Sequence, residues 1–291
     1  MSEIDILHCD VFAPRTGAGN PLAVVRRAET LRDDQMQAIA HWLNLAETTF
    51  VLPPTQPQAD YRVRIFTTHR EIAFAGHPSI GTAHALIDSG LQPKQSGLLW
   101  QECQAGVLPI RHQPGLANNS FSVRVPSSRL VHFAERGDAL LRMALPHVHW
   151  TELPPALVEG GRRWWLAQLA DEDGVRGFRP DRYAIETLAR HSNSLGLCIF
   201  ARRKAPASGL VVRAFPLGVG IDEDPASGAA NAAIAAFLQE TGQLGALGKA
   251  YQVSQGREIG RDAILSLALD DEGQVWVGGD CRTVIRGKLD W

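Results

Sequence analysis

An internal repeat most strongly limits the folds open to this chain. The segment AGHPSIGTAHAL (75–86) aligns with DEDPASGAANAA (222–233) at an offset of 147 residues. This alignment places His77 opposite Asp224, Pro78 opposite Pro225 and Gly81 opposite Gly228. A repeated segment indicates a duplicated structural unit, so we interpret the repeat before the individual helices and strands. The alternative is a chance similarity between two helices rich in alanine and glycine.

Two further matches occur upstream in the same order. VRIF (63–66) aligns with VRAF (212–215) at an offset of 149, and LAETTFV (45–51) with LGLCIFA (195–201) at 150. The small drift is what changes in loop length produce. We therefore expect two similar lobes, one formed by residues 1–115 with 282–291 and the other by residues 116–281.

Strand and helix patterns are mixed through both halves, as α/β and α+β proteins require. Short β-branched segments predict the strands IDILHCDVF, PLAVVRR, TTFVLPP, YRVRIFT, SFSVRVP, LCIFARR, LVVRAFP, AILSLALD and QVWVGGD. Helical periodicity predicts helices at about 31–43, 77–90, 134–145, 181–192 and 224–240.

The composition excludes several classes of protein. The chain has 291 residues, 45% hydrophobic, and a net charge of −2, with no basic stripe for nucleic acid. Its four cysteines are scattered without a CxxC spacing, which indicates a reduced, cytoplasmic protein. The N-terminus resembles no signal peptide, and no apolar run is long enough to span a membrane.

The two predicted helix starts indicate a site for a small anion. Each begins with a polar residue followed by proline, at His77-Pro78 and Asp224-Pro225, which suits the first turn of a helix. Unpaired amides at a helix start favour a carboxylate. Glycines at 76, 81 and 228 would allow close approach of ligand or backbone. Ligands favour the interface between duplicated lobes, so we expect the site there.

The repeat breaks where chemistry could occur. Glu47 aligns with Leu197, and His77 with Asp224, so the expected cleft holds a Glu, a His and an Asp. Burial would raise the pKa of Glu47 toward the range useful for acid/base catalysis. The helix start favours a neutral imidazole at His77. The alternatives are a solvent-facing Glu47, a packed or capping His77, and a purely capping Asp224.

Other motifs carry weaker signals. His147 and His149 form an HxH without a third metal ligand nearby in sequence, so we expect no metal site. No GxSxG, dinucleotide fingerprint or P-loop lysine is present. Arg257 or Arg261 could bind a substrate carboxylate, although most surface arginines have no such role.

Taken together, these residues resemble the PhzF family of phenazine-biosynthesis-like isomerases. The motifs appear in order along nearly the whole chain. They are DVFAPRTGAGNPLAVV (10–25), LAETTFV (45–51), RIFTTHREIAFAGHPSIGTAHAL (64–86), DEDPASGAANAAIAAFL (222–238) and QGREIGR (255–261).

The resemblance implies an α+β, diaminopimelate-epimerase-like fold with two lobes, each a sheet curled around a central helix. It implies a cofactor-free isomerase, commonly a homodimer, with Glu47 as acid/base residue and with Gly76, His77 and Asp224 in the site. The related epimerases exchange protons between two cysteines. None of the four cysteines here lies at a predicted helix start, so we expect no two-thiol mechanism.

Three positions depart from the family pattern. Ala229 stands where the phenazine enzyme carries a serine, Thr68 replaces a common proline, and Ala75 a common cysteine. The change at Ala229 puts the phenazine substrate in doubt and leaves the acid/base residues intact.

The sequence thus predicts an isomerase that moves a proton between carbons of a small carboxylate-bearing metabolite, with Glu47, His77 and Asp224 as catalytic residues. A non-catalytic metabolite-binding protein and an amino-acid epimerase with opposed bases remain the alternatives. The expected substrate-binding residues are Asn20, Gly76, Pro78, Ser79, Gly228, Ala229, Gly256 and Arg257.

Overall fold

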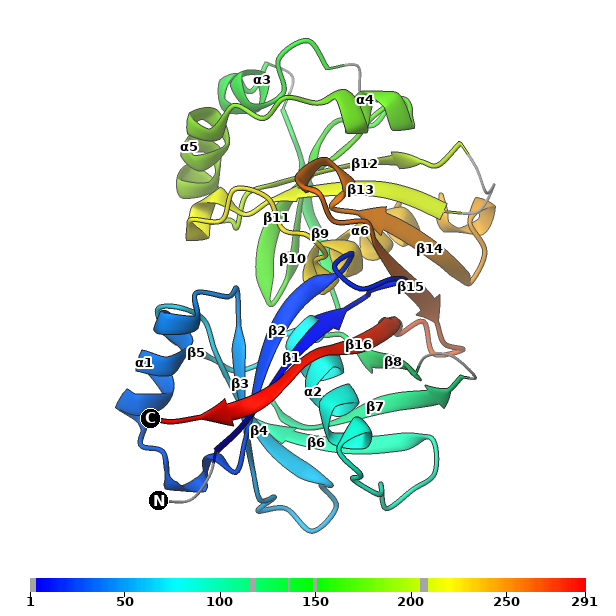
Figure 1. Cartoon of the computed structure of the whole chain (residues 1–291). Coiled ribbons are helices and arrows are strands. Elements are labelled where there is room, and N and C mark those ends of the chain that lie inside the picture. Colours follow the sequence, from blue (N-terminus) through cyan, green and yellow to red (C-terminus); the bar gives the residue numbers. More distant parts are fainter. Residues whose placement is uncertain (1–3, 116–118, 136, 149–150, 205–208) are drawn as a thin grey trace. The chain divides into compact units, whose positions relative to one another are not determined.

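The computed structural model describes residues 4–115, 119–135, 137–148, 151–204 and 209–291. The chain divides into two compact units (Figure 1). Unit 1 comprises Met1–Arg124 and Gly278–Trp291, and unit 2 comprises Val125–Val277. The sequence placed these boundaries at 115/116 and 281/282.

A closed ring of strands forms unit 1. The strands pair in the order β1, β2, β3, β4, β6, β7, β8 and β16, and β16 also pairs with β1. Closure removes the exposed sheet edges that would otherwise recruit other chains. The strands are β1 (Ile4–Val11), β2 (Asn20–Arg26), β3 (Thr48–Leu52), β4 (Tyr61–Phe66), β5 (Glu71–Ile72), β6 (Leu98–Cys103), β7 (Gly106–Pro114), β8 (Asn119–Arg124) and β16 (Val275–Leu289).

Helix α2 (Gly76–Asp88) is the central helix of unit 1. Its residues from His77 to Leu86 are all buried, and it contacts β1, β2, β3, β7 and β8. A helix that is apolar or small on every side is stable only when it is surrounded. A second helix, α1 (Asp33–Leu43), contacts β3 and β4, and its buried residues join a separate apolar cluster with Phe50 and Phe66.

Unit 2 repeats this plan with an open sheet order. Its strands are β9 (Arg129–Phe133), β10 (Ala156–Gly160), β11 (Arg162–Gln168), β12 (Leu197–Arg202), β13 (Gly209–Phe215), β14 (Ala250–Gln255) and β15 (Ala263–Leu269). They pair in the order β15, β14, β13, β12, β11, β10, β9. The central helix α6 (Gly228–Glu240) contacts β9, β10 and β11 and is buried from Ala230 to Leu238.

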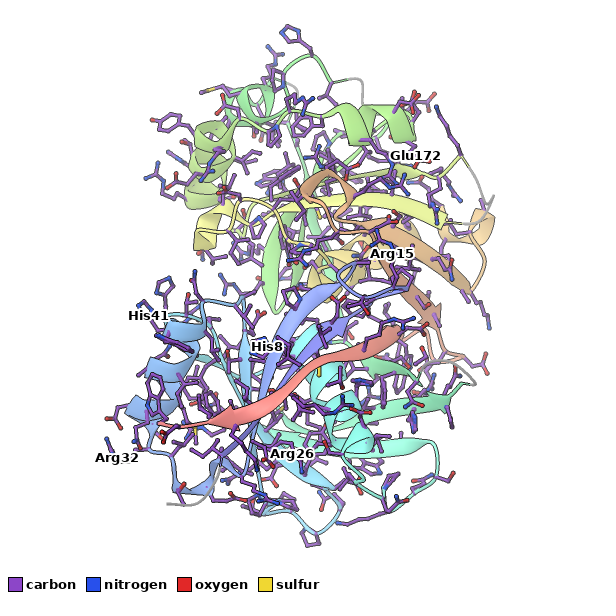
Figure 2. All side chains as sticks on the ribbon, in the orientation of Figure 1. His8, Arg15, Arg26, Arg32, His41 and Glu172 are labelled. Atoms are coloured by element: carbon purple, nitrogen blue, oxygen red, sulfur yellow. The ribbon has the colours of Figure 1, made fainter. Side chains whose placement is uncertain are left out.

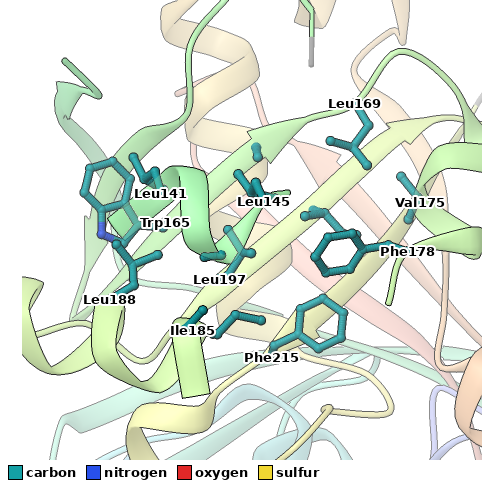
Figure 3. Packing of buried hydrophobic residues seen from close by; sticks show 14 of the residues in the cluster. Leu141, Leu145, Trp165, Leu169, Val175, Phe178, Ile185, Leu188, Leu197 and Phe215 are labelled. Atoms are coloured by element: carbon teal, nitrogen blue, oxygen red, sulfur yellow. The ribbon is translucent and has the colours of Figure 1, made fainter. Parts of the chain in front are cut away.

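Three further helices of unit 2 pack on a second apolar cluster (Figure 3). They are α3 (Ala139–Ala144), α4 (Glu172–Gly177) and α5 (Arg182–Ser192). Leu141 of α3, Val175 of α4 and Leu188 of α5 meet strand residues such as Phe215 there. Each unit therefore has a central helix and a separate apolar cluster that includes residues of its other helices.

Strand register corrects the alignment of the repeat. Thr48 lies opposite Phe66, and Leu197 lies opposite Phe215, so the β3–β4 and β12–β13 pairs correspond at an offset of 149. The left-handed residues Asn44 and Asn193, which end α1 and α5, lie at the same offset. Glu47 therefore corresponds to Gly196, and the alignment with Leu197 was wrong by one residue.

The central helices correspond at an offset of 152, because both have 13 residues and begin at Gly76 and Gly228. Their preceding pairs agree, since Ile65 faces Ile72 as Ala214 faces Asp224. His77 therefore corresponds to Ala229. The alignments of His77 with Asp224 and of Gly81 with Gly228 were wrong, because Pro78 lies inside the first turn of α2 whereas Pro225 lies in the turn before α6.

The predicted duplication and the α+β class are confirmed, with differences in detail. The helix expected at 134–145 is shorter, and strand β9 precedes it. Strands β5, β6, β7, β9, β10, β11 and β14 were not predicted from the sequence. Among the described residues, none of the helices combines the length and apolar character needed to cross a membrane.

Gly81 provides a test of the central packing in unit 1. A Cβ at Gly81 would lie 2.5 Å from Leu22 Cδ2 and 2.7 Å from Val11 Cγ2, which makes this glycine a packing requirement. We expect Gly81→Ala to lower the free energy of unfolding by about 1–3 kcal/mol, in spite of the better helix propensity of alanine. Urea denaturation measures this.

The control is Gly287→Ala in the same unit, whose Cβ would meet only Ile6 Cγ2 at 3.8 Å. Equal urea midpoints for the two variants would contradict the packing argument.

Candidate active site

Glu47 and His77 come together in unit 1. Glu47 directly precedes β3, and His77 is the second residue of α2. Glu47 Oε2 lies 3.5 Å from His77 Nδ1, and the two side chains are 18% and 7% exposed. The alternative of a solvent-facing Glu47 is therefore wrong. A carboxylate and an imidazole in a mostly buried pair can share or transfer a proton.

His77 is neutral at physiological pH. Burial lowers the pKa of its imidazole from 6.5 to about 3, and the Pro21 backbone has a smaller, opposing effect. Its place in the first turn of α2 acts in the same direction as burial. The contact with Glu47 is thus a long polar contact between a carboxyl group and an uncharged ring. Nε2 of the ring is buried and has no hydrogen-bond partner among the described residues.

A buried hydrogen-bond chain fixes the start of α2. The N-cap residue, Ala75, has no side chain that could accept a hydrogen bond. Ser79 Oγ donates to the Ala75 carbonyl at 2.9 Å and accepts from Gln101 Nε2 at 2.9 Å. Tyr61 Oη donates to Gln101 Oε1 at 3.2 Å. The first turn, with Gly76 and Pro78, is therefore held by residues of β4 and β6.

Ser79 was predicted to bind substrate, and its hydroxyl already has two protein partners. Asn20, the first residue of β2, is buried opposite Val11 of β1. Neither Gln101 nor Tyr61 was predicted from the sequence, because a lone polar residue in a strand pattern does not reveal which helix it faces.

Asp224 in unit 2 does not begin a helix, which corrects the sequence prediction. Its amide donates to the Ala214 carbonyl at 2.9 Å, and its carboxylate accepts from the Ala226 amide at 3.0 Å. Helix α6 begins at Gly228, and the Ser227 hydroxyl caps it by accepting from the Ala230 amide at 3.3 Å. Asp224 therefore stabilises a turn before the helix.

Gln255 joins the Asp224 turn to the start of α6. Its Nε2 donates to the Asp224 carbonyl at 2.8 Å, and its Oε1 accepts from the Ser227 amide and from Asn231 Nδ2. Asn231 and Ser79 occupy corresponding positions in α6 and α2. In each unit a buried glutamine thus binds the fourth residue of the central helix.

The segment that follows Gln255 also packs on this turn. Gly256 has φ = 87°, and a Cβ there would lie 2.5 Å from the Pro225 carbonyl oxygen, so glycine is required. Arg257 is half exposed and forms an ion pair with Asp262, with 3.3 Å between Nε and Oδ1. Gly228 and Ala229 form the first turn of α6.

All four cysteines are free thiols with raised pKa values. Burial raises the pKa of the Cys9 thiol to about 12 and also raises those of Cys103, Cys198 and Cys281, which favours the protonated thiol. No group of three potential metal ligands occurs in the part of the chain that the structure describes. His149 of the HxH motif lies outside the described residues.

Sequence comparisons show the family of this chain. The sequence profile of the phenazine biosynthesis-like proteins, PhzC-PhzF, matches residues 9–287. This chain belongs to that family. It is 31% identical to Antisense-enhancing sequence 1 of Schizosaccharomyces pombe, over 99% of both chains. It is also 31% identical to trans-2,3-dihydro-3-hydroxyanthranilate isomerase of Pseudomonas fluorescens, covering 96% of this chain and 97% of the relative.

Solved structures confirm the epimerase-like fold. The phenazine biosynthesis protein of the PhzF family from Bacillus anthracis superimposes with a TM-score of 0.83 at 24% identity, covering 100% of both chains. A hydroxyproline epimerase from Agrobacterium vitis has a TM-score of 0.66 at 16% identity, covering 99% of this chain and 91% of that one.

The lowered pKa of His77 predicts a pH-dependent stability. Between about pH 6.5 and pH 3 the imidazole is protonated when the chain is unfolded and neutral when it is folded. The unfolded state then binds more protons, so stability falls as the pH falls through this range. Between pH 7.5 and pH 5.0 we expect His77 to contribute a loss of about 2 kcal/mol in the free energy of unfolding.

Urea denaturation of His77→Gln at both pH values measures this contribution as a shallower loss than in the unchanged protein. The exposed His69 provides the control, and His69→Gln should retain the full loss. Parallel losses in all three proteins would rule out a neutral, buried His77.

Proposed function

We propose that this protein is an isomerase that moves a proton between two carbons of a small carboxylate-bearing metabolite, without a cofactor. The observation that carries the proposal is the pair of Glu47 and His77, with 3.5 Å between Oε2 and Nδ1 at the start of a buried helix. The relative from Pseudomonas fluorescens, named as an isomerase, supports the reaction class.

Glu47 is the base in this proposal. Its carboxylate removes a proton from a carbon next to an unsaturated group, and the electron pair of the broken C–H bond moves into that group. The protonated Glu47 then returns the proton to a second carbon, so the reaction is balanced and needs no oxidant. Because only part of the Glu47 side chain is exposed, water competes poorly for the proton.

His77 orients Glu47 in this proposal. The neutral ring has one donor and one acceptor nitrogen. If Nδ1 carries the proton, it points at Glu47 Oε2 and holds that carboxylate in place. The free amides in the first turn of α2 favour the substrate carboxylate.

Asp224, with Gly228, Ala229, Gly256 and Arg257, is proposed to contact substrate. These residues lie together at the turn before α6 and in its first turn, where Gln255 and Gly256 pack on the Asp224–Pro225 segment. A homodimer in the cytoplasm remains part of the prediction from the sequence.

The corrected register favours a proton shift over an epimerisation. Inversion at a carbon normally uses groups on both faces. In unit 2 the positions that correspond to Glu47 and His77 hold Gly196 and Ala229, and neither can carry a proton. An epimerase would need Asp224 or another group as the second base.

The test of Glu47 uses solvent deuterium. The protein is incubated in D₂O with trans-2,3-dihydro-3-hydroxyanthranilate and a panel of small unsaturated or amino carboxylates, and products are read by mass spectrometry and NMR. We expect deuterium uptake at carbon, and at least a ~100-fold lower rate in Glu47→Gln, since general base catalysis contributes that much or more.

The control is Glu29→Gln, which changes an exposed glutamate. Full turnover in Glu47→Gln would refute its role as base. Tight binding of one compound, unaffected by Glu47→Gln and without any uptake, would instead support the metabolite-binding alternative. Racemisation of a pure enantiomer would support an epimerase.

A further inference from the structure

Arg213 of β13 forms a buried ion pair with Glu223, next to Asp224. Its Nε and Nη2 bind the two carboxylate oxygens of Glu223 at 2.9 and 2.8 Å. Both side chains are almost fully buried, at 6% and 7% exposed. Nη1 donates to the Phe178 carbonyl at 2.6 Å, and the guanidinium lies 5.0 Å from the centre of the Phe215 ring. Such two-pronged pairs fix orientation as well as distance.

The same device occurs in unit 1. Arg64 of β4 binds the carboxylate of Glu71 at 2.8 and 2.7 Å and lies 5.2 Å from the centre of the Phe66 ring. Glu71 and Glu223 each stand five residues before the first residue of their central helix. Both units thus contain an Arg–Glu pair that joins a strand to the segment just before the central helix.

The pair in unit 2 extends to a second loop. Arg176 of α4 donates to Glu258 Oε1 at 2.9 Å and to Glu172 Oε1 at 2.8 Å. Arg213 Nε lies 4.0 Å from Glu258 Oε2. Glu172, which is labelled on α4 in Figure 2, completes this charge cluster. Arg64 in unit 1 instead makes its second ion pair with the exposed Asp33.

Each buried carboxylate adjoins a predicted site residue. Glu223 precedes Asp224, and Glu258 follows Arg257. We propose that four side chains form a clasp between the two loops: Arg176, Arg213, Glu223 and Glu258. The clasp holds both loops in one arrangement and so positions Asp224 and Arg257. As a statement about catalysis, this rests on the proposed function. Because a buried carboxylate that loses its partner is strongly disfavoured, release at one loop must disturb the other.

Amide hydrogen exchange tests, without any substrate, whether the two loops are coupled through the clasp. Within the described residues, the Arg176 side chain bonds to Glu258, Glu172 and Ser254 and not to Glu223, so a direct effect of Arg176→Gln would stop at those three residues. We expect amides in both 221–226 and 256–261 to exchange at least tenfold faster in Arg176→Gln. Faster exchange confined to 172–177 and 256–261 would overturn the clasp.

The control is Arg163→Gln, which removes another Arg–Glu pair four residues apart in unit 2, with Glu159. It should leave both loops unchanged. If Arg176→Gln does not fold, Arg176→Lys takes its place, since lysine keeps the charge but cannot bind Glu172 and Glu258 with separate fixed nitrogens. We then expect a smaller rise in exchange in both loops, and no rise in 221–226 would overturn the clasp.

Steady-state kinetics test whether the clasp positions Asp224 and Arg257. The substrate is the compound that takes up deuterium in the experiment with Glu47→Gln. We expect kcat/KM to fall at least tenfold in Arg176→Gln and by less than twofold in Arg163→Gln, with Arg176→Lys recovering most of the loss. Full kcat/KM in Arg176→Gln, in spite of faster exchange in both loops, would overturn the positioning role. If no probe turns over, the proposed function fails, and the exchange result alone decides whether the clasp exists.

Discussion

Burial of a helix on all sides is the constraint on which each unit depends. Helices α2 and α6 are made almost wholly of small and apolar residues, so each needs strands around it. Close packing of this kind leaves room for few side chains with hydrogen-bonding groups. Buried polar groups occur at both helix starts, where the backbone amides have no partners within the helix, and α2 also buries Thr82 and His84 further along. The fold therefore creates a polar position at the same point in each unit.

The two units fill that position differently. Unit 1 places a neutral His77 beside Glu47, and the side chain of its N-cap residue, Ala75, has no hydrogen-bond acceptor. Unit 2 has Ala229 in place of His77, and its helix is capped by the Ser227 hydroxyl. Duplication supplied two equivalent frames, and the Glu47–His77 pair occurs in one of them. The proposed function assigns the proton transfer to a single base for this reason.

Electrostatics account for the three successive acids that precede α6. Asp222 forms an exposed ion pair with Arg182, Glu223 the buried pair with Arg213, and Asp224 accepts from the amide of Ala226. An exposed pair contributes little to stability, whereas a buried one resists the loss of either partner. The acids thus have separate partners.

The sequence by itself determined the duplication, the α+β class and the family, because these rest on ordered motifs along the chain. It also singled out Glu47 and His77 through their residue types. It did not determine register, since the Asp224-Pro225 and His77-Pro78 pairs look alike until strand pairing fixes where each helix begins. Gln101, Gln255 and Arg213 were missed because a buried polar residue is recognised only by its partners, which lie 22, 24 and 10 residues away in the chain. Only tertiary structure brings such partners within hydrogen-bond distance.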